Sequence, residues 1–192
     1  MRLILASASP RRRDLLAQIG VVPDELRPTE IDETPMTGEL PRPYVERMAR
    51  EKNMAASGDG LILSADTVVS AGRHILGKPT DTAEAAEFLS LLGGRRHRVT
   101  TSVCLSHDGV LRQRTVETRV KMKRLSDAEL GAYLRSGEWR GKAGGYAIQG
   151  IGAALIPEIN GSYTNVVGLP LVETANLLRG MGYPVSLEGP PA

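Results

Sequence analysis

The 192-residue chain has little cysteine, few aromatic residues and no long apolar run. Its single cysteine, Cys104, cannot form a disulfide within the chain or a cysteine-based zinc site. Aromatic residues make up 4% of the chain, which is too few for a surface that stacks nucleic-acid bases. The apolar run at residues 3–6 is too short for a signal peptide, and no segment reaches the length of a membrane span. We therefore expect a cytoplasmic protein that binds neither a membrane nor a nucleic-acid polymer.

Charge is unevenly distributed along the chain, although the formal net charge is only +2. Residues 95–124 hold nine Lys and Arg residues against two acidic ones, an excess that could attract a polyanion. Within residues 115–123, however, charged residues alternate with Val116, Val120 and Met122, which is the pattern of a half-buried strand. We favour the solvated face of a strand as the interpretation of this basic segment.

The order of apolar runs and helix signals predicts an α/β fold (mixed α+β) with a central mixed sheet flanked by helices. Buried strands are expected at residues 3–6 and 61–65, and a hairpin at residues 98–106 and 110–123. Helices are expected at about 41–56 and 82–92, after Ser9-Pro10, after Ser126 and after Pro170. We expect one domain over residues 1–188 and a frayed tail over 189–192.

The turn before the first helix carries a cluster of hydroxyl and guanidinium groups. Ser7 and Ser9 are followed by Pro10, Arg11 and Arg12, where free N–H groups and the positive end of the helix dipole are expected. Such a turn can bind a polyanion, because arginine pairs with phosphate oxygens bidentately. A capped helix with solvated arginines explains the same pattern equally well.

Two carboxylates and two lysines form a second candidate set. Asp66 follows an apolar strand, and Glu33 lies in a loop. Lys52 is on the apolar side of its helix, and Lys78 follows Gly77. Taken singly, Asp66 could be a structural hydrogen-bond partner and Lys52 a partly buried side chain that reaches solvent. Taken together, the set suits metal-assisted hydrolysis of a phosphoanhydride.

At these residues the chain resembles the Maf family of nucleoside triphosphate pyrophosphatases, once named for septum formation. The resemblance covers nearly all of residues 3–180. It rests on Leu5-Ala6-Ser7-x-Ser9-Pro10-Arg11-Arg12, Ile31-Asp32-Glu33, Arg50-Glu51-Lys52, Ala65-Asp66-Thr67-Val68-Val69, Gly77-Lys78-Pro79, His97-x-Val99-x-Thr101, Lys142-Ala143-Gly144-Gly145-Tyr146-x-Ile148-Gln149-Gly150 and Gly161-Ser162-Tyr163-x-x-Val166-Val167-Gly168-Leu169-Pro170. It implies a Maf/ITPase-like fold with two lobes around a nucleotide-binding cleft.

The resemblance also implies an activity and residue roles. Members of the family hydrolyse nucleotides between the α and β phosphates with Mg²⁺, Mn²⁺ or Co²⁺, and are commonly dimers, so a homodimer is among the implications. Asp66 would be the proton acceptor, and Glu33 would assist it through the metal or the water. The substrate-binding residues would be Ser7, Arg11, Arg12, Lys52, Lys78, Thr67 and Gln149, and the metal ligands Glu33 and Asp66.

The specificity positions Arg11, Thr67 and Gln149 match the dTTP/UTP branch of the family. Modified pyrimidine analogues are further candidate substrates. Use of Thr67 for base selection implies that the strand ends or turns at Asp66, because successive side chains of a strand point to opposite faces. Two alternatives stay open: a pyrophosphatase for 7-methyl-GTP or inosine-type nucleotides, and a non-catalytic nucleotide-binding regulator of cell division.

Overall fold

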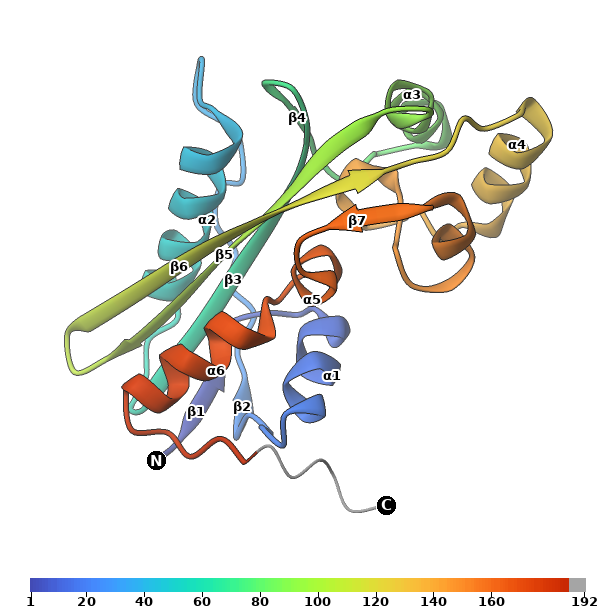
Figure 1. Cartoon of the computed structure of the whole chain (residues 1–192). Coiled ribbons are helices and arrows are strands. Elements are labelled where there is room, and N and C mark those ends of the chain that lie inside the picture. Colours follow the sequence, from blue (N-terminus) through green and yellow to red (C-terminus); the bar gives the residue numbers. More distant parts are fainter. Residues whose placement is uncertain (187–192) are drawn as a thin grey trace.

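The computed structural model describes residues 1–186 and contains one mixed sheet flanked by helices (Figure 1). The strands are β1 (Leu3–Leu5), β2 (Glu25–Leu26), β3 (Leu61–Ala71), β4 (His74–Leu76), β5 (Arg96–His107), β6 (Val110–Lys121) and β7 (Glu158–Asn160). The α-helices are α1 (Pro10–Gln18), α2 (Pro41–Ala55), α3 (Thr82–Leu92), α4 (Asp127–Ser136), α5 (Tyr163–Val167) and α6 (Leu171–Gly180). Two 3-10 helices, η1 (Ala143–Gly145) and η2 (Gly150–Leu155), complete the described chain. The predicted α/β class is confirmed, while the tail predicted at 189–192 lies outside the described residues.

The sheet has the order β2-β1-β3-β5-β6-β7, with β4 paired to β3 outside that path. Strands β2, β1 and β3 run parallel, whereas β3, β5, β6 and β7 are antiparallel. On one edge, β3 pairs with β5 from Ile62 to Ser70. On the other edge, β1 pairs with residues 61–63 and β4 with residues 69–71. Residues 64–68 therefore face a gap in the sheet between β1 and β4.

The prediction that the backbone turns at Asp66 is wrong. Strand β3 continues through Asp66 and Thr67 to Ala71, and both residues keep their register with Ser102 and Thr101 of β5. The two side chains therefore point to opposite faces of the sheet. Both can still reach one cleft, because the free edge at residues 64–68 is open to it from either face.

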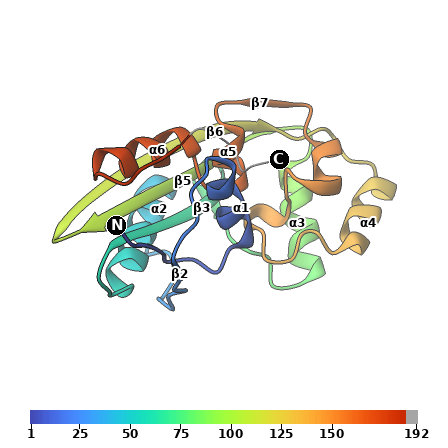
Figure 2. The same cartoon turned by 90° about the horizontal axis from the view of Figure 1, so that it is seen from below.

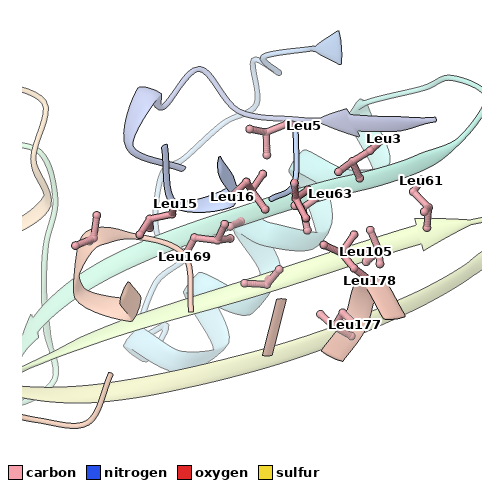
Figure 3. Close-up of a cluster of buried hydrophobic side chains, with 14 residues drawn as sticks. Leu3, Leu5, Leu15, Leu16, Leu61, Leu63, Leu105, Leu169, Leu177 and Leu178 are labelled. Carbon is pink, nitrogen blue, oxygen red and sulfur yellow. The ribbon is translucent and has the colours of Figure 1, made fainter. Parts of the chain in front are cut away.

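Each face of β3 packs against different helices (Figures 1 and 2). The even-numbered residues face α2, where Val68 packs with Val45 and Met48. The odd-numbered residues of its first half, Leu61, Leu63 and Ala65, join the first core cluster, in which β1, α1, β3, β5 and α6 each contribute leucines (Figure 3). A fully buried leucine stabilises the fold by roughly 1.5–3 kcal/mol relative to an exposed one. The helix on either face is thus fixed firmly against the strand that carries Asp66.

A second core cluster lies toward the other end of the β5–β6 hairpin, where α3 and α4 lie in both views (Figures 1 and 2). It includes Leu89 and Leu92 of α3, Tyr133 of α4, and the aromatic residues Trp139 and Tyr146. The chain thus has two packed lobes within one continuous sheet, as the resemblance implied. Among the described residues, no helix has the length and apolar character needed to cross a membrane.

Several local signals have the predicted outcome. Asp108 and Gly109, both with positive φ, form the turn of the β5–β6 hairpin. Ser126 and Glu129 form the capping box at the start of α4. Pro10 occupies the first turn of α1, but the Ser9 hydroxyl makes no capping hydrogen bond. The start of α1 is thus set by the fixed φ angle of Pro10 and not by a side-chain cap.

Candidate active site

A cleft of about 450 Å³ opens at the gap in the sheet, and both lobes contribute to its walls. A volume of this size is typical of small-molecule sites. All nine residues singled out from the sequence line it: Ser7, Arg11, Arg12, Glu33, Lys52, Asp66, Thr67, Lys78 and Gln149. We call the side formed by Glu33, Lys52 and Asp66 the charged wall, and the opposite side, residues 140–149, the loop wall. The topology thus brings together residues that lie up to 142 positions apart in the sequence.

Lys52 is the centre of the charged wall. It lies on the face of α2 that packs against β3, so its ammonium group meets Asp66 on the adjacent strand. Its Nζ lies 2.5 Å from Asp66 Oδ1 and 2.7 Å from Glu33 Oε1, and Lys78 Nζ lies 3.6 Å from Glu33 Oε2. Burial would raise the pKa of Glu33, but the hydrogen bond and charge of Lys52, aided by Lys78, outweigh it and lower that pKa. Glu33 is therefore ionised at neutral pH.

Asp66 presents one oxygen to Lys52 and the other to the cleft. Oδ1 accepts the hydrogen bond from Lys52 Nζ. Oδ2 has no hydrogen-bond partner among residues 1–186, yet it is not among the buried atoms left without a partner, so solvent reaches it. A carboxylate with one fixed and one accessible oxygen can accept a proton from a water molecule in the cleft.

The two arginines that follow Pro10 differ sharply. The guanidinium group of Arg12 donates to Gly168 O at 2.9 Å and to Ser7 Oγ at 3.0 Å, and approaches Thr67 Oγ1 at 3.4 Å. Burial lowers its pKa, although Asp66 and Glu33 counter the effect. Arg11 has no hydrogen-bond or ion-pair partner in the described part of the chain, and burial lowers its pKa as well. Solvated arginines on a capped helix therefore do not describe Arg12, which joins α1 to the loop after α5.

The two proposed base-reading residues have different surroundings. The Thr67 hydroxyl lies 2.9 Å from Thr101 Oγ1 and within reach of Arg12 and Gly168 O. Gln149 is exposed, and none of the described residues forms a hydrogen bond with its amide. Thr67 is thus held in a polar network, whereas Gln149 is free to meet a ligand.

The loop wall contains residues to which the sequence assigned no role. Arg140, Lys142 and Tyr146 line the cleft, and burial together with the charge of Arg11 lowers the pKa of Lys142. Lys142 and Tyr146 belong to a motif that carries the resemblance, while Arg140 precedes it and gives no signal of its own. With these residues, six cationic side chains and two carboxylates line the cleft. Such an excess of positive charge suits a polyanionic ligand.

Two other sequence features lie away from the cleft. Cys104 is buried in β5, and burial raises the pKa of its thiol to about 12, so it is not a nucleophile at neutral pH. The cleft, as the described residues form it, includes none of the basic residues between 95 and 124. On β6, Thr118 and Val120 are buried while Arg119 is exposed, which is the half-buried pattern expected from the sequence.

The fold has a known counterpart among solved structures. It is similar to the structure of a HAM1 protein from Coxiella burnetii, with a TM-score of 0.53 and 14% sequence identity. The match covers 94% of this chain and 99% of that one. At this level of identity the likeness establishes the fold alone, a mixed sheet between helices with a cleft between two lobes.

Sequence comparison gives the family. The family described as Maf-like protein matches residues 2–181, and the chain belongs to it. A protein named dTTP/UTP pyrophosphatase from Cereibacter sphaeroides is 61% identical, with 96% of this chain and 97% of that protein covered. Proteins of the same name from a Ruegeria species and from Roseobacter denitrificans are 60% and 59% identical, with 96% and 94% of this chain and 97% of each protein covered.

Proposed function

We propose that this protein hydrolyses dTTP and UTP between the α and β phosphates, giving a nucleoside monophosphate and pyrophosphate. The names of relatives at about 60% identity over nearly the whole chain support this activity. The observation that carries the chemistry is Asp66, which is fixed by Lys52 at one oxygen and open to the cleft at the other. The excess of cationic side chains around it can bind a triphosphate.

The roles of the residues follow from this arrangement. Asp66 Oδ2 accepts the proton of the attacking water, and the hydrogen bond from Lys52 to Oδ1 orients the carboxylate. Arg11 and Lys78 pair with phosphate oxygens, because among residues 1–186 Arg11 has no partner and Lys78 reaches only Glu33, at 3.6 Å. Arg12 contributes positive charge while holding the loop at Gly168 in place. The negative charge that develops as pyrophosphate leaves is balanced by these cations.

A divalent cation, Mg²⁺, Mn²⁺ or Co²⁺, completes the proposal. Glu33 and Asp66 offer the hard oxygen ligands that such cations prefer, and they already share one positive group, Lys52. Residues 1–186 contain no cluster of three acidic, His or Cys side chains that could hold a metal alone, so phosphate oxygens of the substrate would have to supply further ligands. When bound, the cation would neutralise phosphate charge and polarise the scissile bond.

Two alternatives are tested by the same assay. A pyrophosphatase for 7-methyl-GTP or inosine-type nucleotides would use the same charged wall, but Thr67 and Gln149 favour a pyrimidine. A regulator of cell division that only binds nucleotide would not need two carboxylates paired with Lys52 beside the cleft. A homodimer and a cytoplasmic location stay predictions.

The decisive experiment is pyrophosphate release from a panel of dTTP, UTP, the other natural triphosphates, ITP and 7-methyl-GTP, with and without chelator. We expect kcat/KM for dTTP and UTP to exceed that for ATP and GTP by at least about tenfold. Excess chelator should abolish release, and Mg²⁺ or Mn²⁺ should restore it. No release from any nucleotide would favour the regulator, and full activity in chelator would contradict the metal-binding role of Glu33 and Asp66.

A further inference from the structure

Gln149 depends on its backbone for its position. Its side chain is exposed and has no partner in the described chain, and it lies between an irregular segment and the 3-10 helix η2. An amide that selects a base must nevertheless be held in one place, because discrimination falls when the hydrogen-bonding group can move away. Residues 147–152, which we call the Gln149 loop, must therefore be held in place by contacts with other parts of the chain.

Glu138 binds this loop from behind the cleft. Its Oε1 accepts the backbone N–H of Ile151 at 2.8 Å, and its Oε2 accepts that of Gly152 at 3.0 Å. Both oxygens of one carboxylate thus accept amides from the first turn of η2. Hydrogen bonds to an ionised acceptor are roughly twice as strong as neutral ones.

The loop is shaped to accept this carboxylate. Gly150 has a φ of +73°, and a Cβ atom at this position would collide with the Glu138 carboxylate. A side chain at Gly152 would collide with the carbonyl oxygen of Ala147. Glycine at both positions lets the backbone fold tightly over Glu138 immediately after Gln149.

The other end of the loop is held by the same segment of the chain. The Ala147 N–H donates to the hydroxyl of Tyr133 at 3.1 Å, and the Tyr133 ring is buried in the second core cluster. Gly137, in the left-handed conformation, ends α4 just before Glu138. Tyr133 and Glu138 therefore accept hydrogen bonds from the Gln149 loop on both sides of Gln149. Neither residue lines the cleft.

We propose that Glu138 is a positioning residue for base selection, acting through the backbone of Ile151 and Gly152 on the placement of Gln149. The proposal rests on the proposed function, since it concerns how that activity distinguishes bases. Glu138 does not line the cleft, so it contacts neither the phosphates nor the attacking water. Its loss should therefore alter the choice of nucleotide much more than the turnover number on a saturating pyrimidine substrate.

The test compares Glu138→Gln with Glu87→Gln, a matched loss of charge on the exposed side of α3. The amide keeps one acceptor but turns an NH₂ group toward a backbone N–H. We expect the ratio of kcat/KM for dTTP to that for GTP to fall by about tenfold in Glu138→Gln, mainly through KM for dTTP, and to stay unchanged in Glu87→Gln. In a Gln149→Ala background, Glu138→Gln should change the ratio no further.

Hydrogen exchange of the Ile151 and Gly152 amides supplies a readout that is independent of activity. Exchange should be faster in Glu138→Gln and unchanged in Glu87→Gln. An unchanged dTTP preference in a folded Glu138→Gln protein would overturn the positioning proposal alone. Wild-type protein that releases no pyrophosphate from dTTP or UTP would instead overturn the proposed function, and with it this inference.

A second variant tests the same proposal if Glu138→Gln does not fold. Tyr133→Phe removes only the hydroxyl that accepts the Ala147 N–H and keeps the buried ring. It frees the other end of the Gln149 loop, so it should lower the same ratio in the same direction. An unchanged ratio in a folded Tyr133→Phe protein would count against loop positioning as the source of selectivity.

Discussion

In the charged wall of the cleft, Lys52 and Asp66 are buried between a long helix and a long strand, whereas the loop wall is held by hydrogen bonds from its backbone amides to side chains outside the cleft. In the charged wall, Lys52 of α2 bridges Asp66 of β3 and Glu33 through ion pairs of 2.5 and 2.7 Å. In the loop wall, the Gln149 side chain has no partner in the described part of the chain, and its loop is fastened by Glu138 and Tyr133. In the proposed function, the chemistry common to all nucleotides thus rests on the core, while base reading is divided between Thr67 of β3 and Gln149, which lies on a separately fastened loop.

The largest effect should come from the charged wall. Asp66→Asn keeps the shape of the side chain, but an amide cannot accept the proton of water. We expect kcat to fall by about 10² to 10⁴. The same change in the exposed turn at Asp59 should leave kcat unaltered.

Thermal unfolding of the Asp66→Asn protein should accompany the kinetics, because Lys52 is left with Glu33 as its only carboxylate partner among the described residues. A folded Asp66→Asn protein with near-normal kcat would move the proton acceptor to Glu33.

The next effect separates the two arginines. Arg11→Ala should lower kcat/KM by about 10- to 100-fold with little change in stability, because its guanidinium group contacts no partner within residues 1–186 and is available to phosphate. Arg12→Ala should lower activity and also destabilise the fold by roughly 1.5–3 kcal/mol, because it removes the charged donor to Gly168 O and Ser7 Oγ.

Arg13→Ala is the matched control for both arginines, since Arg13 is an exposed residue of the same helix and forms an ion pair with Asp14. Denaturant unfolding gives the stability of each of the three variants, and steady-state kinetics gives kcat/KM. Equal losses of stability in Arg11→Ala and Arg12→Ala would contradict a stabilising role for the hydrogen bonds of Arg12.

The sequence predicted the charged wall better than the loop wall, for a physical reason. Lys52 could be placed because helical periodicity put it on the apolar face, and Asp66 because it follows an apolar run. The course of β3 beyond Asp66 was missed, because no local signal reveals that a strand edge is left open between β1 and β4. Glu138 was missed because it binds backbone amides 13 and 14 residues away, which depends only on tertiary folding.

A third prediction concerns His97, which holds the loop wall from inside the second lobe. Its Nε2 lies 2.6 Å from the hydroxyl of Tyr146, a cleft residue, and burial lowers the pKa of the imidazole to about 4. The unfolded imidazole binds a proton below about pH 6.5, whereas the folded one stays neutral until about pH 4. Because the unfolded state binds more protons in this window, stability falls as the pH is lowered through it.

Denaturant unfolding at pH 7 and pH 5 measures this contribution. Wild-type protein should lose about 2 kcal/mol more than His97→Gln between the two values. His74→Gln, a change at an exposed histidine, should behave like wild type. Parallel losses in wild type and His97→Gln would mean that the His97 side chain is protonated or exposed in the folded protein.

The smallest expected effect lies at the tip of the loop wall. The amide of Gln149 can donate to O4 and accept from N3–H of uracil or thymine, whereas a carboxylate can only accept. Gln149→Glu should therefore lower the preference for dTTP and UTP over GTP by about tenfold, or roughly 1.4 kcal/mol, while Gln149→Ala lowers it through loss of both bonds. Because the charged wall is untouched, pyrophosphate should still be released from every nucleotide that binds. Side-by-side kcat/KM values for dTTP, UTP, GTP and 7-methyl-GTP check this. A wild-type preference for 7-methyl-GTP that Gln149→Glu leaves intact would remove Gln149 from base selection. It would leave the assignment of the charged wall standing, because the proposed contacts of that wall are with the triphosphate, which all the nucleotides share.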